Sequence, residues 1–148
     1  MVNKSFYLFT CIILSLVCNF PISGYPRTVN QIVINEIGQT LDTYKDGNDE
    51  ILIEQCKKFK PTVKQAALFF SKADPIPGVI LMHERDSPCY AKGSIIFGDG
   101  LSGEWILYSG GTARLDWTRG GTVYLMHKQN KWHDPFACSY GLNNEGEC

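Results

Sequence analysis

The chain has 148 residues, of which 44% are hydrophobic and 20% charged, and its formal net charge is −1. A charge this close to zero gives no indication of a basic surface for nucleic acid, and we expect no nucleic-acid partner. Residues 25–148, which follow an N-terminal leader, suffice for one domain with its own hydrophobic core.

Residues 1–24 have the order of a secretory signal peptide. Lys4 precedes an apolar run over residues 6–17, and the small residues Ser23 and Gly24 follow it. The run is shorter than the ~20 residues of a membrane-spanning helix, so we expect a cleaved leader and no membrane span. Its loss removes one cation and no acid, which changes the charge from −1 to −2. We expect a periplasmic protein, with secretion from the cell as the alternative.

Four cysteines remain after the leader, namely Cys56, Cys89, Cys138 and Cys148. An even number of cysteines in an exported chain predicts two disulfides, and three pairings are possible. Thiolate metal sites need close pairs such as C-x-x-C, and the nearest two cysteines here are ten residues apart. We therefore predict no metal site and no cofactor.

The N-terminal part of the domain predicts helices. Apolar residues recur at four-residue spacing over residues 28–44, which favours an amphipathic helix over a strand. Residues 51–59 form a short strand or helix. A clearer helix begins after Thr62, because Thr62 and Gln65 form a capping box, and Pro75 and Pro77 end it.

Beyond Gly78, short apolar runs alternate with glycine turns, as in a meander of antiparallel strands. We predict strands at residues 79–83, 91–97, 104–108, 113–117 and 122–127. The connecting turns are Gly98-Asp99-Gly100, Ser109-Gly110-Gly111 and Arg119-Gly120-Gly121. The expected fold is α+β. It has an antiparallel meander sheet of about five strands and one or two N-terminal helices, and disulfides cross-link it.

An enzyme would use the ionisable residues His83, Glu84, His127, His133 and Asp134. They form no recognisable catalytic motif, and a second histidine at H-E-x-x-H spacing is missing. A salt-bridged surface loop explains residues 83–86 more simply. A small secreted hydrolase or metal-dependent enzyme stays an alternative, and an envelope structural protein is another.

The glycine turns are the better binding candidates, because a stiff sheet can hold such a loop for insertion into another protein's cleft. The candidate residues are Ser109, Gly110, Gly111, Trp117, Arg119 and Gly120. The alternative interpretation is that these Gly-Gly pairs only form hairpin turns and have no role in binding.

The segment SGG…WTRGGTVYL resembles the signature of periplasmic inhibitors of c-type lysozyme. That family carries a Ser-Gly loop, an aromatic-Thr-Lys-Gly stretch and an alternating strand. The resemblance implies that Ser109 and Arg119 enter the lysozyme cleft and engage its catalytic carboxylates. Ala113 stands where the family has a tyrosine.

The stretches FFSKADPIPG, HERDSPCYAKGSIIF, GEWILYSGG and NKWHDPF also resemble a group of small exported bacterial proteins of unassigned activity. Together these observations predict a periplasmic binding protein or inhibitor. We expect an immunity protein whose partner is a peptidoglycan-degrading bacteriocin or a lysozyme-like toxin.

Overall fold

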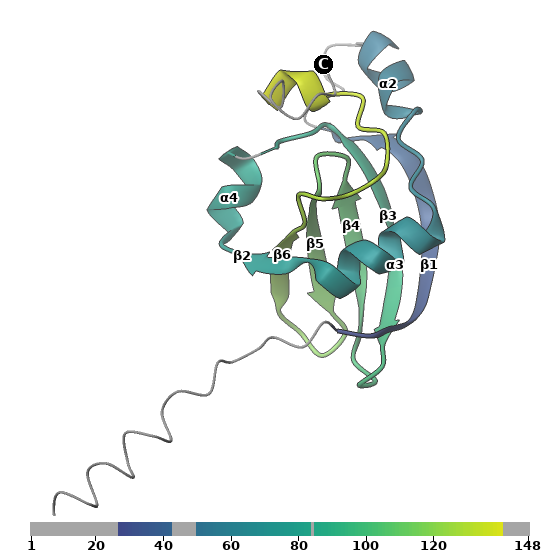
Figure 1. Ribbon diagram of the computed structural model, residues 1–148, viewed down its shortest axis with the longest axis vertical. Coiled ribbons are helices and arrows are strands. Elements are labelled where there is room, and N and C mark those ends of the chain that lie inside the picture. The colour runs from purple at the N-terminus through teal and green to yellow at the C-terminus, as the bar shows by residue number, and fades with distance from the viewer. Residues whose placement is uncertain (1–26, 43–49, 84, 141–148) are drawn as a thin grey trace, which may run out of the picture.

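A computed structural model describes residues 27–42, 50–83 and 85–140 (Figure 1). The predicted leader, Glu84 and Cys148 lie outside these residues. Six strands form one antiparallel sheet in the order β1-β3-β4-β5-β6-β2. The strands are β1 (Val29–Thr40), β2 (Asp74–Ile76), β3 (Cys89–Phe97), β4 (Ser102–Tyr108), β5 (Thr112–Trp117) and β6 (Thr122–Met126). The helices are α2 (Glu50–Cys56), α3 (Val63–Lys72), α4 (Gly78–His83) and the 3-10 helix η2 (Ala137–Tyr140). The predicted α+β class is confirmed.

The chain crosses the sheet once before it builds the meander. β1 forms one edge, α3 then runs across one face of the sheet, and β2 forms the opposite edge (Figure 1). A helix of 10 residues is about 15 Å long, whereas six strands span about 24 Å. Helix α3 therefore covers only part of this inner face.

Helix α3 begins where the sequence predicts. The backbone N–H of Gln65 donates to the hydroxyl of Thr62 at 3.2 Å, and the backbone N–H of Thr62 donates to the side chain of Gln65 at 2.9 Å. This capping box satisfies two of the donors that the first helical turn leaves free. The helix then buries Ala66, Phe69 and Phe70 against the sheet.

The core lies between α3 and the inward-facing residues of the meander. Buried and more accessible positions alternate along β3 and β4, as a sheet with one covered face requires. The largest fully buried side chain is Trp105 of β4. Phe70 of α3 packs on it with ring centroids 5.4 Å apart, which fixes the helix on the sheet.

The predicted helix at residues 28–44 is wrong, because β1 occupies residues 29–40 of this segment as a strand, while residues 43 and 44 lie outside the described part of the chain. Its register along β3 shifts three times, the first between Val29 and Gln31. Such bulges interrupt the two-residue alternation, so Val29, Ile32 and Ile34 pack against the core while Val33 and Ile37 are exposed. The four-residue spacing of Val29, Val33 and Ile37 therefore does not mark one buried face. β-branched side chains also favour a strand.

The predicted strand at residues 79–83 is also wrong, because these residues belong to α4. The backbone N–H of Ile80 bonds the carbonyl of Pro77 at 3.0 Å and starts the helical turn. The sixth strand is β2, which pairs with β6 directly after α3. Pro75 fits this strand because β2 is an edge, where a missing N–H is tolerated.

A disulfide joins Cys56 at the end of α2 to Cys89 at the start of β3. The two cysteines are 33 residues apart in sequence, and closing such a loop in the unfolded chain stabilises the fold by about 3 to 4 kcal/mol. Cys138 is disulfide-bonded as well. A disulfide is thus shown, in agreement with the sequence.

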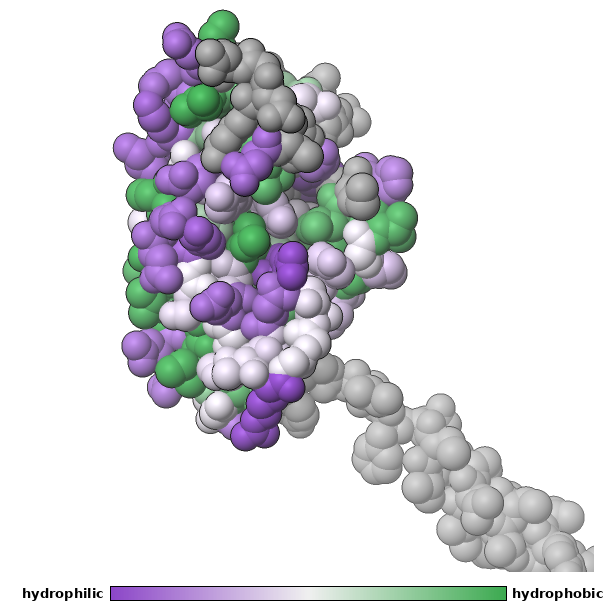
Figure 2. All heavy atoms as spheres, turned by 180° about the vertical axis from the view of Figure 1, so that it is seen from behind, coloured by the Kyte–Doolittle hydropathy of each residue, from purple (hydrophilic) through white to green (hydrophobic). Residues whose placement is uncertain are grey.

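The outer face of the sheet is accessible to solvent. Figure 2 views the molecule from this side, where polar side chains lie among scattered apolar ones. Two ion pairs lie on this face. Lys92 of β3 pairs with Glu36 of β1 at 2.9 Å, and Arg114 pairs with Asp116 within β5 at 3.0 Å. Within the described residues, none of the helices has the length and apolar character needed to cross a membrane.

Candidate functional site

The two Gly-Gly turns predicted for binding lie at opposite ends of β5. The turn at residues 109–111, called here the packed turn, precedes the strand, and the turn at residues 118–121, called the open turn, follows it. A strand of six residues separates them by about 17 Å. The structure therefore does not bring the candidate residues into one site, and the two turns are separate candidates for binding.

Ser109 of the packed turn is fully buried. Its hydroxyl donates to Oδ1 of Asp134 at 2.6 Å and lies 2.6 Å from the hydroxyl of Ser87. Its carbonyl accepts the indole N–H of Trp132 at 2.7 Å. The hydroxyl thus holds the C-terminal segment onto the sheet, and the expectation that it enters a partner's cleft does not fit this geometry.

The glycines of the packed turn are enclosed by neighbouring segments. A Cβ at Gly110 would lie 2.2 Å from the carbonyl oxygen of Arg85, and one at Gly111 would lie 2.4 Å from Nδ2 of Asn130. Both glycines are buried. They are needed for close packing of the backbone and are not presented to a partner.

The open turn has the opposite environment. Arg119, Gly120 and Gly121 are exposed, and a Cβ at either glycine would meet nothing within 4 Å. Backbone hydrogen bonds of 2.9 Å connect Trp117 to both glycines. Thr118 is held by the neighbouring strand, because its N–H bonds the carbonyl of Ser102 at 2.9 Å. Within the described residues, Arg119 forms no ion pair, so its guanidinium is available on a firmly held turn.

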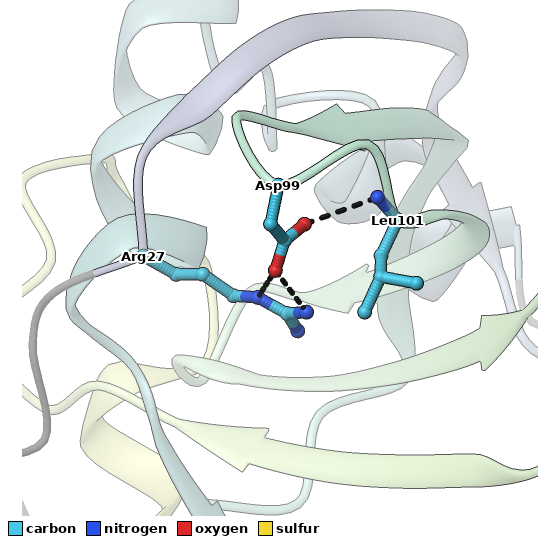
Figure 3. A network of polar contacts seen from close by, with 3 residues as sticks. All are labelled: Arg27, Asp99 and Leu101. Carbon is cyan, nitrogen blue, oxygen red and sulfur yellow. Dashed lines mark hydrogen bonds and ion pairs between the residues drawn. The ribbon is translucent and has the colours of Figure 1, made fainter.

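The turn between β3 and β4 lies at the same end of the sheet and is tied to Arg27 (Figure 3). The guanidinium of Arg27 donates to Oδ2 of Asp99 at 2.7 Å and 3.1 Å. The other carboxylate oxygen accepts the backbone N–H of Leu101 at 3.0 Å. The hydrogen bond from Arg27 is the main reason that the pKa of Asp99 lies below its usual value, and the bond from Leu101 adds to it.

Arg27 also stacks on two aromatic rings. Its guanidinium carbon is 4.6 Å from the ring centroid of Phe97 and 4.6 Å from that of Trp117. The two rings pack on each other with centroids 5.6 Å apart. This cation–π contact joins the segment just before β1 to β5, the strand that carries the open turn.

A groove of about 950 Å³ opens on the part of the inner face that α3 leaves uncovered. At one end it is bounded by Arg27, Phe97 and Trp117, close to the open turn. Its floor and walls are largely apolar and include Phe70, Leu115, Val123, Leu125 and Ile76. The volume lies within the range found for ligand pockets, and the groove is partly open to solvent.

The far end of the groove carries charged and titratable groups. Lys72 and Asp74 lie where α3 passes into β2, and His127 and Lys128 follow β6. The pKa of His127 is lowered, first by burial beside the core and then by the charge of Lys72, while Asp74 opposes the shift. The ring of His127 also contacts Phe69, with centroids 6.3 Å apart.

The residues of the alternative enzyme hypothesis are spread over several elements. His83 ends α4, His127 follows β6, and His133 is exposed in the C-terminal segment. Asp134 accepts hydrogen bonds from Ser109 and from the N–H of Phe136 at 3.1 Å. Among residues 27–42, 50–83 and 85–140, no three His, Cys, Asp or Glu side chains are grouped to hold a metal ion.

Sequence reasoning identified the exposed Arg119 and the groove residue Trp117, but missed Arg27, Phe97 and the groove. The turn containing Asp99 was recognised, but nothing in the sequence pairs this aspartate with an arginine 72 residues earlier. The groove follows from the placement of a short helix on a wider sheet. That relation becomes visible only when the strand order is known.

Comparisons of the chain with protein-family models, curated proteins and solved structures found no match.

Proposed function

We propose that this chain is an exported binding protein of the inhibitor or immunity type, which blocks a peptidoglycan-cutting enzyme or bacteriocin by stoichiometric binding. The contact is the open turn, with Arg119 at its exposed position. The predicted leader supports this proposal, and the disulfide between Cys56 and Cys89 is compatible with an oxidising compartment.

The observation that carries the proposal is the combination of exposure and restraint at Arg119. The side chain is exposed, while backbone hydrogen bonds hold the turn at Trp117 and Thr118. A loop that is already ordered loses little conformational entropy when it binds, so a small insertion can bind tightly. A guanidinium entering a cleft lined by catalytic carboxylates also gains charge-assisted hydrogen bonds there.

The proposed mechanism differs from the two-residue insertion that the family resemblance implies. Ser109 lies at the other end of β5 and its hydroxyl is engaged by Asp134. Arg119 therefore acts without it, together with the neighbouring Trp117 and the turn that contains Asp99. The resulting inhibition is steric: the turn occupies the cleft and excludes the glycan strand.

The experiment titrates the chain without its leader, residues 25–148, into a c-type lysozyme and a panel of other muramidases, with lysis of peptidoglycan suspensions as the readout. We expect inhibition of at least one enzyme that is complete at a molar ratio of one. A lack of inhibition across the panel contradicts the proposed function.

The site is tested with Arg119→Glu and a matched charge reversal, Lys64→Glu, on the exposed side of α3. Arg119→Glu should weaken binding at least thirtyfold, the loss expected when one member of a desolvated charge pair is reversed. Lys64→Glu should leave the inhibition constant within a factor of two. Equal effects of the two substitutions would remove the open turn from the interface.

A further inference from the structure

We propose that Arg27 is a positioning residue for the open turn. Its role is to hold the ring of Trp117 and the neighbouring turn at Asp99 in place, so that Arg119 is presented to a partner in one orientation. This inference rests on the proposed function, because it concerns the site through which the partner would be bound. It adds to that site a residue from the segment just before β1.

The first argument is the set of contacts that Arg27 makes. Its guanidinium donates to Oδ2 of Asp99 from Nη2 at 2.7 Å and from Nε at 3.1 Å (Figure 3). The same group lies 4.6 Å from the ring centroid of Phe97 and 4.6 Å from that of Trp117. The backbone beside it is fixed as well, because the carbonyl of Thr28 accepts the first N–H of the turn between β3 and β4 at 2.8 Å. A planar guanidinium can bond a carboxylate at its edge while its face lies on aromatic rings.

The second argument is that these contacts connect strands that are not neighbours. Phe97 ends β3 and Trp117 ends β5, and their rings lie 5.6 Å apart although β4 runs between the two strands. Gly103 of β4 pairs with Trp117 and has no side chain, so the indole can lie over β4 toward Phe97. Arg27 contacts both rings and therefore closes this link between the ends of β3 and β5.

The third argument is that Trp117 holds the backbone of the open turn. Its N–H donates to the carbonyl of Gly121, and its carbonyl accepts the N–H of Gly120, each at 2.9 Å. Arg119 belongs to the short loop that these two bonds close, and its side chain is exposed. A displacement of Trp117 therefore displaces Arg119, and a turn that has become mobile must lose conformational entropy when it binds. Loss of Arg27 should weaken binding at Arg119 by this route.

Arg114 offers a matched control for the contribution of charge. It is also an exposed arginine paired with an aspartate, because its Nε lies 3.0 Å from Oδ2 of Asp116, and it belongs to the same strand as Trp117. Within the described residues, the cation–π contacts involve Arg27 and not Arg114. Loss of an arginine charge should act alike at both positions, whereas loss of positioning should follow Arg27 alone.

The first experiment needs no partner and uses residues 25–148. Arg27→Ala should speed amide hydrogen exchange of Trp117 and Gly120 about tenfold, since local opening no longer breaks the cation–π and ion-pair contacts. It should also increase quenching of tryptophan fluorescence by acrylamide, because the other two tryptophans are buried in the core. Arg27→Lys keeps the charge but not the planar stacking, so it should give an intermediate exchange rate. Arg114→Ala should change neither readout by more than twofold, and equal responses to the two alanine substitutions would overturn the assignment.

The second experiment measures inhibition of a muramidase that the unsubstituted chain inhibits. Arg27→Ala should weaken inhibition about fivefold to tenfold. In the Arg119→Glu background it should weaken inhibition less than twofold, because a positioning effect is lost with the contact that it serves. A purely structural loss would weaken both backgrounds equally and would overturn the assignment. If no muramidase is inhibited, the proposed function fails, whereas exchange and quenching still decide whether Arg27 holds the turn.

Discussion

The packed turn and the open turn share a Gly-Gly pair in sequence but have opposite roles in the structure. At the packed turn, Gly110 leaves room for the backbone of Arg85, and Ser109 anchors the C-terminal segment. At the open turn, Gly120 and Gly121 meet no neighbour and serve only the positive φ angles of the turn, 95° and 91°. A glycine pattern therefore predicts a turn and does not predict whether a partner can reach it.

Gly110→Ala should give the largest effect of the substitutions that distinguish the turns. The added methyl group would lie 2.2 Å from a backbone oxygen, which can move only if the segment around Arg85 moves as well. We expect a loss of about 3 kcal/mol or more in the free energy of unfolding. Urea denaturation measures it, and a loss below 1 kcal/mol would show that this turn is loosely packed.

Ser109→Ala should cost about 2 to 3 kcal/mol, because it removes a hydrogen bond to a carboxylate and leaves the buried hydroxyl of Ser87 with only the N–H of Cys89 as its partner. The matched control is Ser102→Ala near the open turn, where an exposed hydroxyl pair is 3.1 Å apart. Its cost should stay below about 0.5 kcal/mol. Thermal unfolding of both variants compares the two ends directly, and equal costs would remove the contrast between them.

Gly120→Ala should cost about 1 to 2 kcal/mol, since only the positive φ angle opposes a side chain there. Gly120→Asn should recover part of this loss, because asparagine tolerates the left-handed region better than alanine. Denaturant titration checks both values. A loss as large as that of Gly110→Ala would mean that the open turn is sterically restricted after all.

The smallest effect concerns pH and His127, whose backbone N–H donates to the carbonyl of Gly111 in the packed turn at 3.0 Å. Burial lowers the pKa of His127 from 6.5, so the unfolded chain binds more protons just below that value. Stability should therefore decrease as pH falls below about 6.5, and the change should be small because solvent screens the ring. His127→Gln should flatten this dependence in pH-dependent thermal melts, and an unchanged slope would contradict the assignment.

The helix over α3 and the four meander strands were predictable from the sequence because their signals are local. The capping box of Thr62 and Gln65 indicates the start of the helix, and glycine turns separate strands in which apolar and polar residues alternate. Strand β1 was mistaken for a helix because its bulges, which depend on pairing with β3, distort the alternation. The two Gly-Gly turns look alike in sequence, and the burial of Ser109 could not be predicted because it depends on Trp132 and Asp134, over 20 residues later.

The central claim is that the open turn binds the partner and the packed turn maintains the fold. Amide hydrogen exchange of residues 25–148, measured alone and in the presence of saturating c-type lysozyme, tests it most directly. We predict that lysozyme slows exchange at residues 117–121 and leaves unchanged the slow exchange that we expect at residues 109–111 in the free protein. Protection that appears at residues 109–111 and not at residues 117–121 would contradict the claim.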